Sequence, residues 1–189
     1  MALLTVRPAR IDKDLARAVA RHTNPQIERG AKTLTWGADG HVLVAAASLG
    51  WLLTRKSDEP LRRLATHVLV SALATAVLPH ILKSFIAQER PDRRTIRGHW
   101  RGMPFSGKPS DAFPSGHALH VGALASAATL LPPEVRNLVW AAGTALVGTR
   151  IVLAAHWLTD VLAGLGFGFA LERVIRVVTK PAPIRRSPM

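Results

Sequence analysis

Three short stretches between residues 83 and 160 hold side chains that could together do chemistry at phosphorus. They are Lys83 with Arg90-Pro91, then Pro114-Ser115-Gly116-His117, and then Arg150 with His156 and Asp160. An arginine binds phosphate oxygens through paired hydrogen bonds and a lysine binds them as a point charge, so three cations indicate a phosphate site. Two imidazoles and a carboxylate can supply a nucleophile, an acid and an orienting group.

The third stretch holds the expected nucleophile. His156 and Asp160 are four residues apart, a spacing that puts both on one face of a helix. The carboxylate can then accept a proton from one ring nitrogen and leave the other as a nucleophile or base. Arg150 stands at the edge of an apolar segment, where the alternative role is to extend its charge toward the membrane surface.

The second stretch is typical of a helix start. Ser115 directly precedes an apolar run and is expected to cap it, while Gly116 lets a ligand approach the backbone closely. The free N–H groups of such a helix start favour a phosphate, beside which His117 would lie. Taken alone, the tetrapeptide more often means a turn with a structural histidine. The pair Lys83 and Arg90 is equally ordinary alone, because basic residues end many spans.

The elements that position these stretches are five apolar blocks, at 41–54, 64–82, 118–131, 135–153 and 157–171. A membrane-spanning helix needs about 20 mostly apolar residues. Blocks 64–82 and 135–153 reach this length; 118–131 and 157–171 reach it only with their flanks, and 41–54 is short. A soluble helical bundle is the alternative, but five such blocks leave little polar surface to cover them. We therefore predict an all-α, multi-pass transmembrane bundle of about five spans.

Alternating spans would bring the three stretches to one membrane face. Lys83 ends the second block, His117 begins the third, Arg150 ends the fourth and His156 begins the fifth.

The regions outside the blocks are basic. Residues 1–40 are predicted to form an amphipathic, interfacial segment: in 9–22, Ile11, Leu15 and Val19 recur at helical spacing, so this helix either lies on the membrane or packs against the bundle. Residues 41–179 form the predicted membrane domain, with a basic loop at 93–108, and 180–189 read as a disordered basic tail.

The net charge of +13 fits anionic headgroups and positive cytoplasmic loops, so no nucleic-acid partner is expected. The chain has no cysteine, which excludes disulfides and thiolate metal sites, and its start does not resemble a signal peptide.

Together the three stretches make the sequence similar to the type-2 phosphatidic acid phosphatase superfamily, in its bacterial integral-membrane branch. The family pattern is Lys-x6-Arg-Pro, Pro-Ser-Gly-His and Ser-Arg-x5-His-x3-Asp. The chain matches all of it except that Thr149 replaces the serine before Arg150. The superfamily also includes soluble acid phosphatases and vanadium haloperoxidases. The resemblance covers residues 83–160 by motif and leaves the first 40 residues outside it.

The resemblance implies a role for each site residue. His156 would attack phosphorus and become a phosphohistidine, Asp160 would orient it, and His117 would protonate the leaving group and later activate water. The phosphoryl oxygens would be held by Lys83, Arg90, Arg150, Ser115 and Gly116. No metal or other cofactor is implied, since fixed cations stabilise the transferring group.

The implied substrate is a phosphate monoester or diphosphate of a membrane lipid: phosphatidate, phosphatidylglycerol phosphate, polyprenyl diphosphate or a phosphorylated polyprenyl sugar. The expected location is the bacterial inner membrane with the site on the periplasmic face, although the basic N-terminal segment then conflicts with the positive-inside rule if 41–54 spans. One alternative is a basic membrane protein that binds anionic lipid or a partner without catalysis. Another is a vanadate-dependent peroxidase, whose known examples are soluble. The sequence leaves the oligomeric state open.

Overall fold

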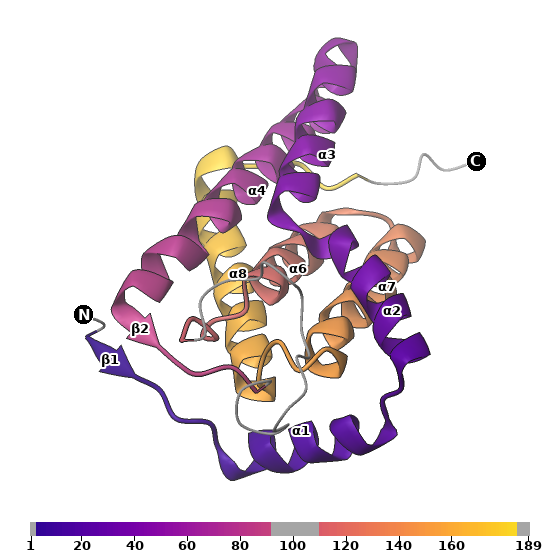
Figure 1. Cartoon of the computed structure of the whole chain (residues 1–189). Helices are drawn as coiled ribbons and strands as arrows, with labels where there is room; N and C mark the ends of the chain where they lie inside the picture. The colour runs from indigo at the N-terminus through magenta and orange to yellow at the C-terminus, as the bar shows by residue number, and fades with distance from the viewer. Residues whose placement is uncertain (1–2, 92–109, 185–189) are drawn as a thin grey trace.

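The computed structural model describes residues 3–91 and 110–184, which are mostly helical (Figure 1). The all-α prediction is confirmed, apart from two strands of two residues each. The predicted loop 93–108 and the final residues 185–189 lie outside the described parts. The elements before the first motif are β1 (Leu4–Thr5), α1 (Arg10–His22), α2 (Pro25–Leu34), η1 (Thr35–Ala38), α3 (Gly40–Leu53), η2 (Thr54–Lys56) and α4 (Glu59–Phe85). They are followed by β2 (Ile86–Ala87), α6 (Gly116–Ala127), η3 (Ala128–Leu130), α7 (Pro133–Val152) and α8 (Leu158–Thr179).

Each of the five apolar blocks forms a helix, but the helices differ in length. At 1.5 Å per residue, the 14 residues of α3 and the 12 of α6 extend only about 21 and 18 Å, against a hydrocarbon core of about 30 Å. Within the described residues, α4 alone is both long and apolar enough to cross a membrane by length and composition. The number of spans therefore stays a prediction.

Helices α6 and α8 pack closely at the centre of the fold because glycines line their contact. A Cβ added to Gly168 would lie 1.9 Å from the carbonyl oxygen of Leu119, and one added to Gly122 would lie 2.2 Å from that of Leu165. Gly164 faces the carbonyl oxygen of Ser115 in the same way, at 2.5 Å. Such small residues let two helix backbones approach directly. The contact brings the first turns of α6 and α8 together.

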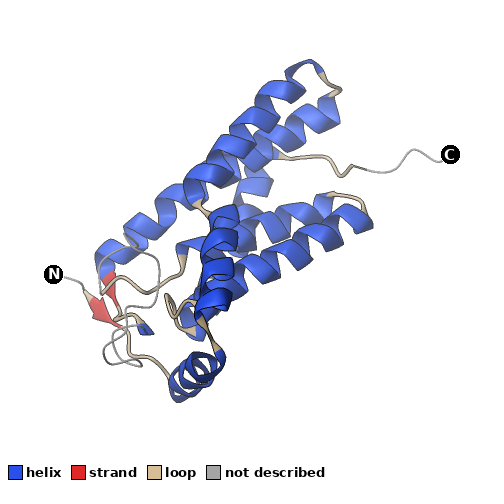
Figure 2. Ribbon diagram, turned by 45° about the vertical axis from the view of Figure 1, so that its right-hand side comes forward, coloured by secondary structure: helices blue, strands red, loops and turns tan. Residues whose placement is uncertain are grey.

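The N-terminal helices pack against the bundle. Helix α1 lies across the end at which α8 begins, roughly perpendicular to the other helices (Figures 1 and 2). Its Asp12, which is 1% exposed, accepts hydrogen bonds of 2.9 and 2.8 Å from the backbone N–H and hydroxyl of Thr159. Strand β1 pairs in parallel with β2. Of the two expected roles for α1, packing against the bundle is confirmed, while Ile11 stays 60% exposed.

A buried polar cluster joins α4, α6 and α8 at the opposite end. The Glu172 carboxylate accepts hydrogen bonds from Ser126 and from Arg176 and lies 2.7 Å from His67 Nε2. Beyond α8, the N–H of Ile184 donates to the carbonyl oxygen of Leu130, so the first residues of the predicted tail follow the bundle.

Candidate active site

One cavity of about 800 Å³ lies where α4 and α7 end and α6 and α8 begin. Its walls include six of the eight predicted site residues: Lys83, Arg90, Gly116, His117, Arg150 and His156. The other two, Ser115 and Asp160, are fully buried behind this wall. The structure therefore brings the three sequence stretches together at one end of the bundle.

His156 lies in the tight connection between α7 and α8, with its ring buried. Its Nδ1 is 2.7 Å from the carbonyl oxygen of Ala112. A carbonyl only accepts hydrogen bonds, so Nδ1 carries the proton and the neutral ring keeps its lone pair on Nε2. The nearest Asp160 oxygen is 3.7 Å from Nδ1. The hydrogen bond that we expected from the ring to Asp160 is thus made to Ala112 instead.

Asp160 serves both helices that flank the cavity. Its Oδ2 accepts the N–H of Trp157 at 2.8 Å and so caps the start of α8. Its backbone carbonyl accepts the N–H of Ser115 at 3.1 Å, which ties α8 to the start of α6. The predicted cap of α6 is confirmed, since the Ser115 hydroxyl accepts the N–H of Ala118 at 3.4 Å.

Arg90 and Lys83 share one acidic partner. Arg90, which is 4% exposed, donates from Nε and Nη2 to Asp111 Oδ1 at 3.1 and 2.8 Å. Its Nη1 donates to the carbonyl oxygen of Ala155, next to His156, at 2.8 Å. Lys83 Nζ lies 3.7 Å from Asp111 Oδ2. Both cations are therefore held against the cavity wall by Asp111.

Arg150 points into the protein and is 2% exposed, so the alternative of a charge extended toward the membrane surface is wrong. Its Nη1 donates to the Thr35 hydroxyl at 3.1 Å, and its buried Nε has no hydrogen-bond partner among residues 3–91 and 110–184. A buried unpaired donor on a charged group is costly, and an anion in the cavity would satisfy it. The neighbouring Thr149, where the family has serine, bonds to Leu146 of its own helix.

Sequence reasoning missed several residues of the cavity wall. Asp111, Asp39 and His120 line it, and Thr35 holds Arg150 from behind. Asp111 had a signal, because it is the only acidic residue between Asp92 and Glu134 in a stretch rich in cations. Thr35 had none, since 115 positions separate it from its partner. Residues 35–39, which we placed in an N-terminal segment apart from the membrane domain, thus contribute to the cavity.

The electrostatics of the cavity favour a neutral imidazole at His156. Burial lowers the pKa of His156 well below its ordinary value, and the nearby charges of Arg90, Arg150 and Lys83 lower it further. The hydrogen bond to Ala112 acts in the opposite direction without reversing the shift. For Asp39, burial alone would raise the pKa, but the backbone N–H groups of Val42 and His41 hold it below its ordinary value. The arrangement is a cavity lined by three cations with an unprotonated imidazole beside them, which could bind an anion.

Comparisons with known sequences point to one family. The model of the PAP2 superfamily matches residues 64–182. The lipid A 1-phosphatase of Rhizobium etli is 36% identical over 106 residues, which cover 56% of this chain and 46% of that protein. The phosphatidylglycerophosphatase B of Escherichia coli strain K12 is 30% identical over 123 residues, covering 57% and 46%. The chain spans about half the length of the curated relatives it matches.

Solved structures share the fold. The crystal structure of Aquifex aeolicus LpxE superposes with a TM-score of 0.66 at 16% identity and covers 88% of this chain and 95% of that one. The first transmembrane PAP2-type phosphatidylglycerolphosphate phosphatase from Bacillus subtilis superposes with a TM-score of 0.60 at 18% identity, covering 90% and 85%. Because the family model matches well over half of the chain and includes every motif residue, the protein belongs to the PAP2 superfamily.

Proposed function

We propose that the protein is a lipid phosphatase that hydrolyses a phosphate monoester or diphosphate of a membrane lipid. The observation that carries this proposal is the convergence of Lys83, Arg90 and Arg150 on a cavity that also holds His156, whose Nε2 lone pair is available. Three fixed cations suit the charge that develops on the equatorial oxygens of a transferring phosphoryl group. The phosphatase names of the sequence relatives agree with this chemistry.

In the proposed mechanism, His156 Nε2 attacks phosphorus, a P–N bond forms, and the P–O bond to the lipid breaks. His117, which lines the same cavity, takes up a proton as the anionic phosphate binds beside it and gives that proton to the departing oxygen. His117 then takes a proton from water, whose oxygen attacks phosphorus and breaks the P–N bond. Inorganic phosphate leaves and His156 is restored. Asp160 acts by capping α8 and so positions the connection that carries His156, while the Ala112 carbonyl fixes the tautomer.

The outer surface of the bundle supports a membrane location. Large apolar side chains on the outsides of the helices are solvent-exposed to an extent that is unusual for a surface facing water. Examples are Leu73 and Val77 on α4, Leu138 on α7, and Leu162, Val174, Val177 and Val178 on α8. Trp36 lies near the cavity end, whereas Trp51 and Trp140 carry Arg55 and Arg136 over their rings nearer the other end. Tryptophans near both ends are typical of the two membrane interfaces.

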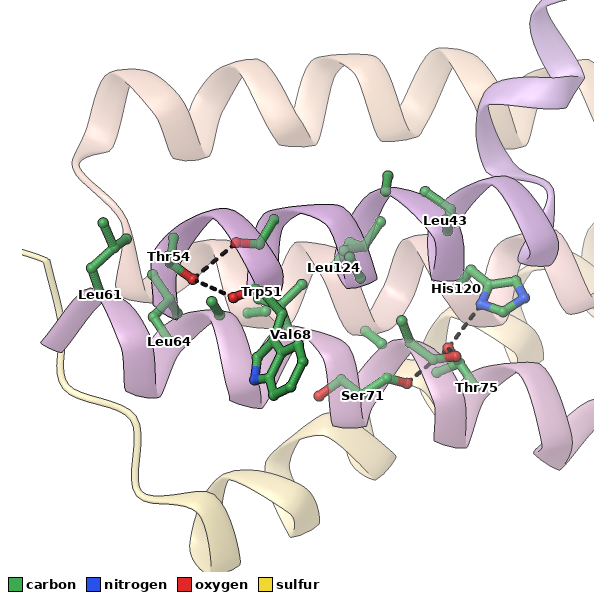
Figure 3. Close-up of a pocket in the computed structure, with 17 residues that line it drawn as sticks. Leu43, Trp51, Thr54, Leu61, Leu64, Val68, Ser71, Thr75, His120 and Leu124 are labelled. Carbon is green, nitrogen blue, oxygen red and sulfur yellow. Dashed lines mark hydrogen bonds between the residues drawn. The ribbon is translucent and has the colours of Figure 1, made fainter. Parts of the chain in front are cut away.

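An apolar groove beside the cavity supports a lipid as substrate. This groove of about 350 Å³ runs between α3, α4 and α6 and is lined by side chains such as Leu43, Leu64 and Leu124 (Figure 3). His120 lines both hollows, so the groove adjoins the cationic cavity. Figure 3 shows His120 bonded to Thr75 at this junction. We propose that an acyl or prenyl chain lies in apolar space of this kind while its phosphate is in the cavity.

We further propose an inner-membrane location with the cavity on the periplasmic face. The basic segment 55–63 and residues 180–184 then lie on the cytoplasmic side, as the positive-inside rule favours. The basic helix α1 contacts α8 at the cavity end, so it would lie on the outer side. A basic helix on the outer side conflicts with the positive-inside rule. The short α3 eases this conflict, because about 21 Å of helix does not need to span the bilayer fully.

The test is phosphate release by the purified protein in detergent from a panel of phosphatidate, phosphatidylglycerol phosphate and polyprenyl diphosphate. We expect release from at least one lipid, inhibition by vanadate, and no loss with a metal chelator. His156→Ala should remove activity and should not retain radiolabelled phosphate after a rapid quench, whereas the wild type should. His22→Ala is the matched control, since His22 is exposed on α1 and, within the described parts of the chain, bonds only inside its own helix.

Activity that survives His156→Ala would contradict the assignment of the nucleophile. Binding of anionic lipid without phosphate release from any lipid would instead favour a non-catalytic lipid-binding protein.

A further inference from the structure

Asp111 contacts two of the three cations that the proposed function assigns to phosphate binding. Arg90 donates to its Oδ1 from both Nε and Nη2, at 3.1 and 2.8 Å. Lys83 Nζ lies 3.7 Å from its other oxygen. This Nε–Nη2 edge of a guanidinium can also bind a phosphate through two parallel hydrogen bonds. The Asp111 carboxylate therefore takes the position on these two cations that a phosphoryl group would need.

The backbone around Asp111 is fixed, while its side chain faces the cavity. The N–H of Gln88 donates to the carbonyl oxygen of Ser110, and the N–H of Ala112 donates to that of Gln88, both at 2.9 Å. Ala112 in turn holds His156. The Asp111 side chain is 19% exposed and lines the cavity. It can rotate away from Arg90 without moving the backbone that holds the nucleophile.

The charges of the cavity indicate that Asp111 and a bound phosphoryl group would compete for the same cations. The charged side chains described in its wall are Asp39, Lys83, Arg90, Asp111 and Arg150, which sum to +1 with the histidines neutral. A phosphate ester brings up to two negative charges to the same cations, so it and Asp111 repel each other at short range. A site of three cations without an opposing carboxylate would retain its inorganic phosphate product tightly.

We propose that Asp111 competes with the phosphoryl group for Lys83 and Arg90 and thereby speeds the release of phosphate. The inference rests on the proposed function. In the resting site Asp111 keeps both cations in place. When substrate binds, the Asp111 carboxylate moves away from Lys83 and Arg90, and the phosphoryl oxygens bind these two cations instead. When the phosphohistidine is hydrolysed, Asp111 returns and displaces the product.

The test is Asp111→Asn, which removes the charge and keeps an oxygen that can accept from Arg90. Inorganic phosphate should bind this variant about tenfold more tightly than the wild type, as measured by calorimetry in detergent and by competitive inhibition. The KM for the lipid phosphate should fall, and kcat should fall with it because product release slows. Asp111→Glu, which restores the charge, should return phosphate affinity toward the wild-type value.

Asp58→Asn is the matched control. Asp58 is exposed and precedes the first turn of α4, about 37 Å along the helix from Lys83, so the same charge change there should leave phosphate affinity unaltered. Unchanged or weaker phosphate binding by Asp111→Asn would overturn the inference and identify Asp111 as a support for Arg90 only. If the wild type still releases phosphate from lipid in that case, the proposed function stands without the inference. If the wild type neither binds phosphate nor hydrolyses lipid phosphates, both the proposed function and the inference are contradicted.

Discussion

The contact between α6 and α8 gives a prediction whose size can be worked from the structure. In Gly168→Ala, the new Cβ would lie 1.9 Å from the carbonyl oxygen of Leu119, and real Cβ atoms essentially never come within 3.0 Å of such an atom. The two backbones must therefore part by about 1.1 Å. Leu119 is two residues from His117, and α8 begins beside His156, so the displacement reaches the cavity.

Two effects should follow from this displacement. Overpacking of this kind costs roughly 1–3 kcal/mol of stability, and here the upper end applies because a backbone oxygen cannot rotate away. A misplacement of about 1 Å between reacting groups costs on the order of a hundredfold in rate. Gly168→Ala should thus lower kcat about a hundredfold and lower the melting temperature, measured by phosphate release and by tryptophan fluorescence in detergent.

Gly166→Ala is the control on the same helix. A Cβ at this position meets no atom within 4 Å, and alanine favours a helix over glycine by about 1 kcal/mol. This variant should keep its activity and melt at the same or a higher temperature. If Gly168→Ala matched Gly166→Ala in both measurements, the role assigned to close packing of α6 and α8 would be refuted.

Two further predictions concern single contacts of the cavity. Thr35→Val removes the hydroxyl that accepts from Arg150 and leaves a buried guanidinium N–H unpaired. We expect this variant to lose about 1–3 kcal/mol of stability and to bind phosphate more weakly. Thr35→Ser, which keeps the hydroxyl, should be near wild type in both measurements. The pKa of His156 lies below its ordinary value when folded, so its contribution to stability is fully present above about pH 6.5 and is lost as pH falls toward the folded pKa. The stability advantage of the wild type over His156→Asn should therefore shrink by up to about 1.4 kcal/mol per pH unit below 6.5. Thermal unfolding of both proteins from pH 7.5 to 5.5 measures this advantage. An advantage that stays constant over this range would argue against a buried, neutral His156.

The sequence alone determined the helices and the residue types that line the cavity. Five apolar blocks gave five helices, because hydrophobic runs and caps such as Ser115 act locally along the chain. The spacing of Arg150, His156 and Asp160, together with the alternation of the blocks, correctly predicted that the cations and both histidines meet at one end. The number of spans did not follow, because α3 and α6 are shorter than the hydrocarbon core and block length alone does not say whether such a helix crosses the membrane.

Tertiary structure decided which partner each side chain of the cavity has. His156 bonds to Ala112 and not to Asp160, and Arg150 bonds to Thr35, because these partners depend on how segments distant in sequence are packed. Asp111 was visible as a lone acid, yet only the folded chain places it on Lys83 and Arg90. Local patterns specify elements and residue types, whereas hydrogen-bond geometry depends on distances of tenths of an ångström that emerge only when α4, α6, α7 and α8 pack together.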